Sequence, residues 1–514
     1  MSSSKSMDFI PYELSDEESR DFDDLRKGID DRNKQLTRAE CGELPKWEYP
    51  LGIIKDAQDA AKKHHDLVSG RLTRLFEWPT KKEADENLFY KADPPNNTFD
   101  RSKEWFSEQG FHSFETQYSF SDGWDKQSLT VAIYVPQQLP IDQKSPVMWM
   151  FHGGGFCTGA ADFIPWYSQT AVQRAKQKNA IIIAPNDPLG PEGNYVDIYQ
   201  AIYDFLRWYK EGGYFKKVWD DTDDKTKSWQ EWLCREVANK GGKLAIDKDQ
   251  VYVEGESAGA HAAVTAMWLN AAKDGGLKIP IQAALLRFPM IAHYKRTVKA
   301  GEKVPYMGPK YSQDDIKAKA EAVEEEILKL ERMGIVPTCT GRPPPRGMAF
   351  AVFLSVPGKW QSCFQRQHGD STLDKERLLD EDGIIRESLM DGIERAEICA
   401  NRVDHELLPP IYIYHGQKDP NCPLTNTEKF VATLRKPELY GDRFKDTKTL
   451  SLDVVRYLNK KPNFDQAKGI HYVTDDEVGH GFDYDLDEKD EPFLKKAYDW
   501  VGSFWGLRSE NIPL

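Results

Sequence analysis

The chain has 514 residues, enough for roughly two to three domains at about 150 residues each, or for one large core with a lid. Its formal net charge of −14 disfavours nucleic acid and anionic membrane surfaces as partners, because both repel an acidic protein. The seven scattered cysteines form no C-x-x-C pair, which disfavours a zinc site. Without an apolar signal segment or a transmembrane-length run, the sequence predicts reduced thiols, a cytoplasmic location and no integral membrane association.

The composition changes along the chain and suggests a division into segments. Residues 1–45 are polar and acidic, so we expect a solvated or loosely attached segment there. Residues 46–111 combine helical patterning with bulky aromatic side chains, and they either cover a site as a lid or buttress the core. Residues 112–295 and 405–514 are predicted to form the catalytic core. The intervening residues 296–404 are too many for one crossover, and we predict an inserted lid or a helical subdomain away from the site.

Strand signals run through both parts of the predicted core. We expect strands over 114–120, 129–135, 147–151, 180–185, 251–253, 283–288, 411–414 and 470–473. Helical patterns lie between several of them, including 163–178 and 195–209. Continuous apolar runs that alternate with helices indicate a mostly parallel sheet buried on both faces. The predicted fold class is therefore α/β, with helices on both faces of a central sheet and right-handed crossovers.

The most informative motif is Gly255-Glu256-Ser257-Ala258-Gly259, which follows an apolar strand and precedes a helical stretch. A G-x-S-x-G nucleophile elbow requires this strand–turn–helix setting. A Cβ at either flanking glycine is expected to collide with the neighbouring strand or helix. We predict that the Ser257 hydroxyl stands at a helix N-terminus, where developing negative charge is stabilised. Taken alone, an ordinary Gly-Ser turn is the alternative.

A second motif, His152-Gly153-Gly154-Gly155, directly follows another predicted strand. Consecutive glycines let the backbone approach a ligand and turn N–H groups toward one point. In acyl transfer such donors, joined by the N–H of Ala258, bind the oxyanion of the tetrahedral intermediate. A phosphate-binding loop is the competing interpretation, but neither a Gly-Lys-Ser/Thr ending nor G-x-G-x-x-G is present. We expect His152 to be a structural member of the loop rather than a base.

Two further residues complete a candidate catalytic set. Asp419 lies in the turn beyond the predicted strand 411–414, at the sheet edge where catalytic groups of parallel sheets collect. His480 lies between two glycines in a later loop, and a surface histidine is the alternative. The chain order Ser257, Asp419, His480 is typical of serine hydrolases on this kind of sheet. Ser257 would attack, His480 would carry its proton, and Asp419 would orient the imidazole. The acidic neighbours of His480, which are disfavoured as its partner because loop neighbours seldom reach behind the ring, are Asp475, Asp476 and Asp483.

Together these motifs resemble the hormone-sensitive-lipase-like branch of the α/β-hydrolase fold, over about residues 112–295 and 405–505. The resemblance implies a mainly parallel eight-stranded sheet, a lid from N-terminal and inserted segments, and no cofactor or metal. It implies that Gly154, Gly155 and Ala258 supply the oxyanion N–H groups. The supporting motif residues are His152, Gly153, Gly255, Glu256 and Gly259. The sequence departs from the family pattern at 186–192, where Asn-Asp-Pro-Leu-Gly-Pro-Glu replaces Tyr-Arg-Leu-x-Pro-Glu, and in a longer insertion before Asp419.

The chemistry predicted from these motifs is cleavage of a carboxylic ester or lactone through an acyl-enzyme. Aromatic residues in the lid segments suggest a small-molecule substrate with an apolar or aromatic portion, and hydrolysis of an N-acyl amide is a close variant. The alternative class is a lyase or acyl transferase that uses the same triad and oxyanion hole. A non-catalytic receptor is a third candidate, which normally requires loss of a triad residue. A homodimer is a further candidate assembly.

Overall fold

The structure is a computed structural model, and only part of the chain is described below. The described residues are Lys27, 99–120, 128–140, 142–212, 228–292, 299, 301–306, 310–312, 316–318, 320–322, 325, 346–360, 364, 391–459, 478–484 and 486–505. Apart from Lys27, the predicted acidic segment 1–45 lies outside these residues, and so does most of 46–111. The predicted strand at 470–473 also lies outside them.

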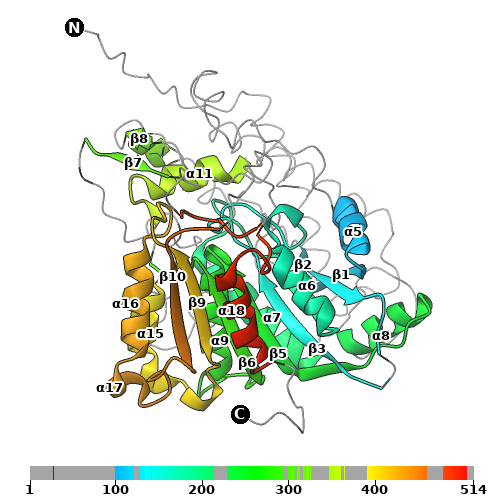
Figure 1. The fold of residues 1–514 in the computed structure, drawn as a ribbon. Coiled ribbons are helices and arrows are strands. Elements are labelled where there is room, and N and C mark those ends of the chain that lie inside the picture. The colour runs from blue at the N-terminus through cyan, green and yellow to red at the C-terminus, as the bar shows by residue number, and fades with distance from the viewer. Residues whose placement is uncertain are drawn as a thin grey trace.

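A single large sheet forms the centre of the molecule. Its strands are β1 (Phe111–Phe120), β2 (Ser128–Pro136), β3 (Ser145–Phe151), β4 (Ile181–Pro185), β5 (Ile246–Glu256), β6 (Ile281–Arg287), β9 (Ile411–Gly416) and β10 (Leu450–Val455). These eight strands lie in the order β1-β2-β4-β3-β5-β6-β9-β10 (Figure 1). The pairs β1–β2 and β2–β4 are antiparallel, and the other pairs are parallel. The prediction of a mostly parallel sheet is therefore confirmed.

Helices cover both faces of this sheet. The α-helices whose bounds are described are α5 (Phe99–Glu108), α6 (Gln169–Gln177), α7 (Tyr195–Glu211), α8 (Trp229–Asn239), α9 (Ala258–Ala271), α11 (Arg346–Ser355), α15 (Gly392–Ile398), α16 (Leu424–Leu434), α17 (Pro437–Tyr440) and α18 (Pro492–Gly502), and not all of them lie on the sheet. Along β3, Val147, Trp149 and Phe151 enter the core shared with α7 and α9. Met148 and Met150 enter the opposite core, shared with α6 and α18. Because both faces are buried, the strand is a continuous apolar run in the sequence.

Local sequence explains where helix α7 begins and ends. Asn194 and Asp197 form a capping box, in which each side chain accepts a hydrogen bond from the other residue's backbone N–H. The helix ends at Gly212, which has φ 90° and takes the left-handed conformation that glycine adopts without strain. This helix matches the one predicted over 195–209.

Several elements were not predicted from the sequence, among them strand β10 and helix α8. Strand β10 carries partly exposed side chains at its four central positions, so it lacks the apolar run that marks the inner strands. Helix α8 lies within a charged stretch, 216–242, for which we predicted no element. It begins after a Ser228 cap and buries Trp229, Leu233 and Val237 at helical spacing, while charged residues occupy its other faces.

The segment 296–404 contributes a short antiparallel ribbon, β7 (Lys303–Pro305) with β8 (Lys310–Ser312), and the helices α11 and α15. Figure 1 shows the ribbon and α11 beyond the upper end of the sheet. Helix α15 instead packs against α9 and α16. None of the helices within the described ranges combines the length and the apolar character needed to span a membrane.

Candidate active site

Strand β5 passes into helix α9 through a single residue, Ser257. Its backbone has φ 50° and ψ −118°, a conformation that is strained for a residue with a side chain. A Cβ on Gly255 would lie 2.4 Å from the carbonyl oxygen of Gly259, and a Cβ on Gly259 would lie 2.1 Å from the carbonyl oxygen of Phe151. The turn therefore requires glycine at both flanking positions, as a nucleophile elbow does.

The structure brings Ser257, His480 and Asp419 into one hydrogen-bonded chain. Ser257 Oγ lies 3.0 Å from His480 Nε2, and His480 Nδ1 lies 2.7 Å from Asp419 Oδ2. The three side chains are largely buried, with exposed fractions of 7%, 8% and 7% respectively. They come from the turn after β5, the loop at 478–484 and the turn after β9, so residues far apart in the sequence meet at one edge of the sheet.

Asp419 is held by several hydrogen-bond donors. Its Oδ1 accepts from the backbone N–H groups of Asn421 and Cys422, both at 2.9 Å. His415 Nε2 lies 3.1 Å from Oδ2, the oxygen that also faces His480. Burial alone would raise the pKa of Asp419, but attraction to His480 and the histidine hydrogen bonds outweigh it, and the pKa is held well below its usual range. The carboxylate is therefore ionised beside the imidazole at neutral pH.

The environment of His480 favours its protonated form. Burial alone would lower the pKa of His480, but the charge of Asp419, with a contribution from Cys422, raises the pKa well above its usual value. The imidazole also packs edge-on against Phe288, with ring centroids 4.8 Å apart. The ring is thus held in one orientation and is suited to accept a proton from Ser257.

Asp483, one of the alternative partners of His480, binds Arg287 and Tyr414 instead. Its two carboxylate oxygens accept hydrogen bonds from Arg287 at 2.7 and 3.0 Å, and it also accepts one from the Tyr414 hydroxyl. The other two alternatives, Asp475 and Asp476, lie outside the described residues. Among the described carboxylates, Asp419 is the one bonded to His480 Nδ1.

The glycine loop after β3 approaches the elbow. The backbone N–H of Gly153 donates to Glu256 Oε1 at 3.1 Å. By contrast, the backbone N–H groups of Gly154, Gly155 and Ala258 donate no hydrogen bond within the described part of the chain. Ala258 is the first residue of α9, where an N–H has no partner inside the helix. Among the described residues these three N–H groups have no acceptor, as donors to an anionic oxygen would require.

His152 makes its hydrogen bond within its own loop. Its Nδ1 lies 2.8 Å from the carbonyl oxygen of Gly153. Burial lowers the pKa of His152 to about 4, against the effect of that hydrogen bond, so the ring is neutral near pH 7. Neither nitrogen of His152 bonds to Ser257, His480 or Asp419 among the described contacts.

The inserted segment contacts the glycine loop through Trp360. A Cβ on Gly155 would lie 3.0 Å from the indole carbon Cη2 of Trp360. The indole stacks on Phe364, with ring centroids 5.1 Å apart, and its Nε1 donates to Ser355 Oγ at 2.8 Å. An aromatic side chain from the segment 296–404 therefore lies on the side of Gly155 to which a Cβ would point.

Several residues with contacts to the site were not predicted from the sequence, including Asn421 and Phe288 described above. His415 contacts Asp419 from four residues earlier in the chain, at 3.1 Å. Cys422 reaches the same carboxylate through its N–H, and Trp360 reaches the glycine loop from a distant segment. The Cys422 contact is a local turn around Asp419, whereas the Trp360 contact depends on how a distant segment folds back onto the glycine loop.

Comparisons with a family model and with curated relatives agree with the observed fold. A family model described as the α/β hydrolase fold matches residues 148–325. A probable carboxylesterase M8 from Phoma sp. is 38% identical over 66 residues, which is 13% of this chain and 21% of that protein. The arylacetamide deacetylase of Oryctolagus cuniculus is 24% identical over 164 residues, which is 32% of this chain and 34% of that protein. The chain thus spans about a third or less of the length of these curated relatives.

Among solved structures, the esterase LipW from Mycobacterium marinum is 14% identical, with 83% of this chain and 91% of that chain covered and a TM-score of 0.41. That score is too low to bear on the assignment, which depends on the family match and on the structure itself. The match over residues 148–325, the sheet order and the strained turn between β5 and α9 together identify the core of this chain as an α/β hydrolase fold.

Proposed function

We propose that the protein is a serine hydrolase that cleaves a small-molecule carboxylic ester or lactone. The observation that carries the proposal is the hydrogen-bonded chain from Ser257 Oγ to His480 Nε2, 3.0 Å, and from His480 Nδ1 to Asp419 Oδ2, 2.7 Å. The relatives named as a carboxylesterase and an arylacetamide deacetylase support the same chemistry. Because the second relative is named a deacetylase of an amide, hydrolysis of an N-acyl amide is a close variant of the proposed reaction.

The first half of the proposed reaction forms an acyl-enzyme. Ser257 Oγ attacks the substrate carbonyl carbon while His480 Nε2 takes the hydroxyl proton, and Asp419 stabilises the resulting imidazolium. The carbonyl oxygen becomes an oxyanion that accepts hydrogen bonds from the N–H groups of Gly154, Gly155 and Ala258. His480 then gives its proton to the leaving alcohol oxygen as the bond to the carbonyl carbon breaks.

The second half releases the acid. A water molecule loses a proton to His480 as its oxygen attacks the acyl carbon, and the same N–H groups stabilise the second oxyanion. The proton returns to Ser257 Oγ as the ester bond to the enzyme breaks. The aromatic wall formed by Trp360 beside Gly155 favours an apolar or aromatic group on the substrate.

The test is turnover of p-nitrophenyl esters, from acetate to dodecanoate, by the wild type and by Ser257→Ala. Ser503→Ala is the matched control, since Ser503 is exposed just beyond α18 and its hydroxyl bonds only to the Trp500 carbonyl oxygen among the described contacts. Ser257→Ala should lose at least about three orders of magnitude in kcat, while Ser503→Ala should match the wild type.

Other outcomes point elsewhere. Equal turnover by wild type and Ser257→Ala would mean that Ser257 is not the nucleophile. A folded wild type that is acylated but releases no acid would favour the acyl transferase alternative. A wild type that neither turns over any ester nor reacts with a fluorophosphonate at Ser257 would contradict the proposal and favour a receptor.

A further inference from the structure

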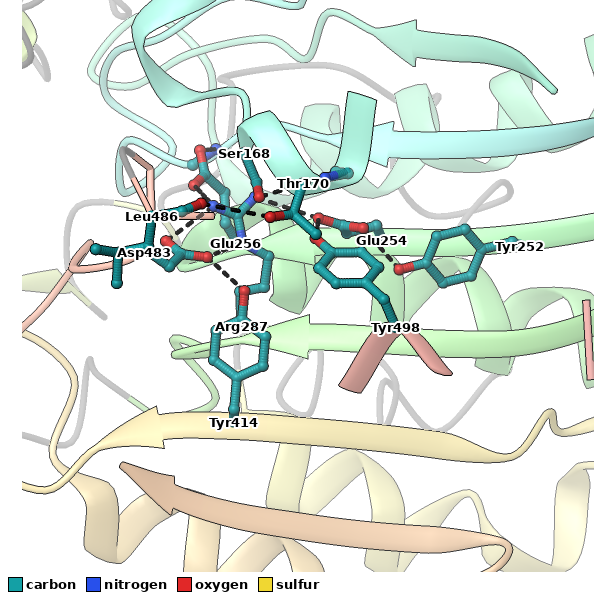
Figure 2. A network of polar contacts seen from close by, with 12 residues as sticks. Ser168, Thr170, Tyr252, Glu254, Glu256, Arg287, Tyr414, Asp483, Leu486 and Tyr498 are labelled. Atoms are coloured by element: carbon teal, nitrogen blue, oxygen red, sulfur yellow. Dashed lines mark hydrogen bonds and ion pairs between the residues drawn. The ribbon is translucent and has the colours of Figure 1, made fainter. Parts of the chain in front are cut away.

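One buried arginine lies among three buried carboxylates at the end of the sheet that carries the elbow (Figure 2). Arg287, the last residue of β6, donates from Nε and Nη2 to the two oxygens of Asp483 at 2.7 and 3.0 Å. Its Nη1 lies 3.3 Å from Glu254 Oε1, and its Nη2 lies 3.5 Å from Glu256 Oε2. All four side chains have no exposed surface.

Tyrosine hydroxyls complete this cluster. Tyr252 and Tyr498 donate to Glu254 at 2.6 and 3.1 Å, and Tyr414 donates to Asp483 (Figure 2). Burying several charges in a core costs more solvation energy than the attraction usually returns, and apolar residues of similar size often serve stability as well or better. Stability alone therefore does not account for this arrangement.

Glu256, Asp483 and the backbone of Arg287 each connect the cluster to a different part of the candidate site, whereas Glu254 does not. Glu256 directly precedes Ser257, and its Oε1 accepts the N–H of Gly153 in the glycine loop. Asp483 lies three residues after His480, within the same loop. The backbone carbonyl oxygen of Arg287 itself accepts the N–H of Ser257 at 3.0 Å. One guanidinium thus connects the elbow, the glycine loop and the histidine loop.

We propose that Arg287 is a positioning residue, which holds the glycine loop and the His480 loop in register with Ser257 through Glu256 and Asp483. This inference rests on the proposed function. A guanidinium is planar and donates at fixed angles, so it can hold two carboxylates in a defined relative position, which a lysine ammonium cannot. Misplacing a catalytic group by about 1 Å can cost about 10²-fold in rate, so such a constraint has a measurable effect on kcat.

A pair of tyrosine substitutions separates positioning from stability. Tyr414→Phe removes the hydroxyl that supports Asp483, on the His480 side of the cluster. Tyr498→Phe removes an equally buried hydroxyl that supports Glu254, on the side away from the three loops. Both changes delete one oxygen atom from a buried ring, so similar decreases in Tm are expected.

The expected result is a fall of about tenfold in kcat for Tyr414→Phe, with KM unchanged, and wild-type kcat for Tyr498→Phe. Arg287→Lys should lower kcat by about 10²-fold with KM unchanged, measured well below its own Tm. The rate at which a fluorophosphonate labels Ser257 should fall in the same order. If Arg287→Lys does not fold, the tyrosine pair decides the question.

Two results would overturn the inference. One is a kcat and labelling rate for Tyr414→Phe within about twofold of the wild type. The other is an equal loss in both tyrosine variants that follows their loss of Tm, which would assign the cluster a structural role only. A wild type that neither turns over esters nor labels at Ser257 would instead mean that the proposed function has failed, and the inference with it.

Discussion

Replacing Gly155 by alanine tests the glycine loop at the point where the inserted segment touches it. Gly155 has φ +62°, and a Cβ there would lie 3.0 Å from Trp360 Cη2. Gly275 has a similar φ of +70°, but a Cβ there would meet nothing within 4 Å. Gly275→Ala therefore isolates the backbone cost of about 1–2 kcal/mol for an L-residue in the left-handed region. Gly155→Ala should carry the same cost and a steric contact in addition.

The expected loss of activity follows from that contact. At 3.0 Å the new methyl group is tighter than nearly all Cβ contacts, so either the loop or the indole must give by a few tenths of an ångström. A buried indole that is stacked and hydrogen-bonded resists displacement, so we expect the loop to move and the N–H of Gly155 to move with it. Loss of one oxyanion donor costs about 3–4 kcal/mol, or about 10²–10³ in kcat. We expect Gly155→Ala to lie near the lower end of that range, because the donor is displaced rather than removed.

The assay is kcat and KM for p-nitrophenyl acetate together with Tm, for Gly155→Ala, Gly275→Ala and the double variant Gly155→Ala/Trp360→Phe. The double variant should recover part of the lost kcat, because a smaller ring leaves room for the methyl group. Gly275→Ala should lose stability but keep its kcat. If Gly155→Ala behaves like Gly275→Ala, with kcat within about twofold of the wild type, the N–H of Gly155 does not stabilise the transition state.

Three further predictions concern charge and pocket shape. Because Asp419 raises the pKa of His480 above its usual 6.5, kcat/KM should still increase with pH above 6.5. Asp419→Asn should move this increase in kcat/KM to lower pH and lower kcat by about 10⁴-fold. Trp360→Ala should shift the preferred p-nitrophenyl ester toward longer acyl chains, because it removes the indole next to Gly155. An unchanged optimum of acyl chain length would mean that the acyl group does not bind next to Trp360. Burial raises the pKa of Asp187 from 3.8 to about 7, so its stabilising contribution is complete below the unfolded value and is lost as pH rises through 7. Asp187→Asn should therefore have the same unfolding free energy as the wild type near pH 4, and a higher one at alkaline pH, by up to about 4 kcal/mol. Denaturant titrations at both pH values measure this difference. The same difference between variant and wild type at both pH values would contradict the reasoning.

A strand could be predicted from the sequence where it formed a continuous run of apolar residues. Strand β3 is apolar at every central position because both of its faces are buried, and it was predicted at nearly its observed bounds. Within the described residues strand β10 pairs with β9 alone, and its partly exposed positions remove the same signal. Position in the sheet does not decide the outcome by itself, because β1 at the other end of the described sheet was predicted over 114–120.

The site was predictable where chemistry requires a local motif, and not where it depends on tertiary contacts. The elbow, the glycine loop and the His480 loop each have a short pattern whose glycines are visible in the sequence. The pairing of Arg287 with Asp483 spans 196 positions, and it depends on which loop follows which strand in the assembled sheet. An arginine at the end of β6 carries no feature that predicts this partner.

The motif glycines and the contacts between the loops have the same physical origin. A Cβ on Gly259 would lie 2.1 Å from the Phe151 carbonyl oxygen, so helix α9 packs directly against the end of β3. A Cβ on Gly416 would lie 2.3 Å from the Gly479 carbonyl oxygen, so the turn that carries Asp419 packs directly against the His480 loop. Substitution at either glycine must separate two backbone segments that carry site residues, whereas a side-chain contact can adjust by a rotamer change. Gly259 and Gly416 therefore let the backbone segments that carry Ser257, Asp419 and His480 lie in direct contact.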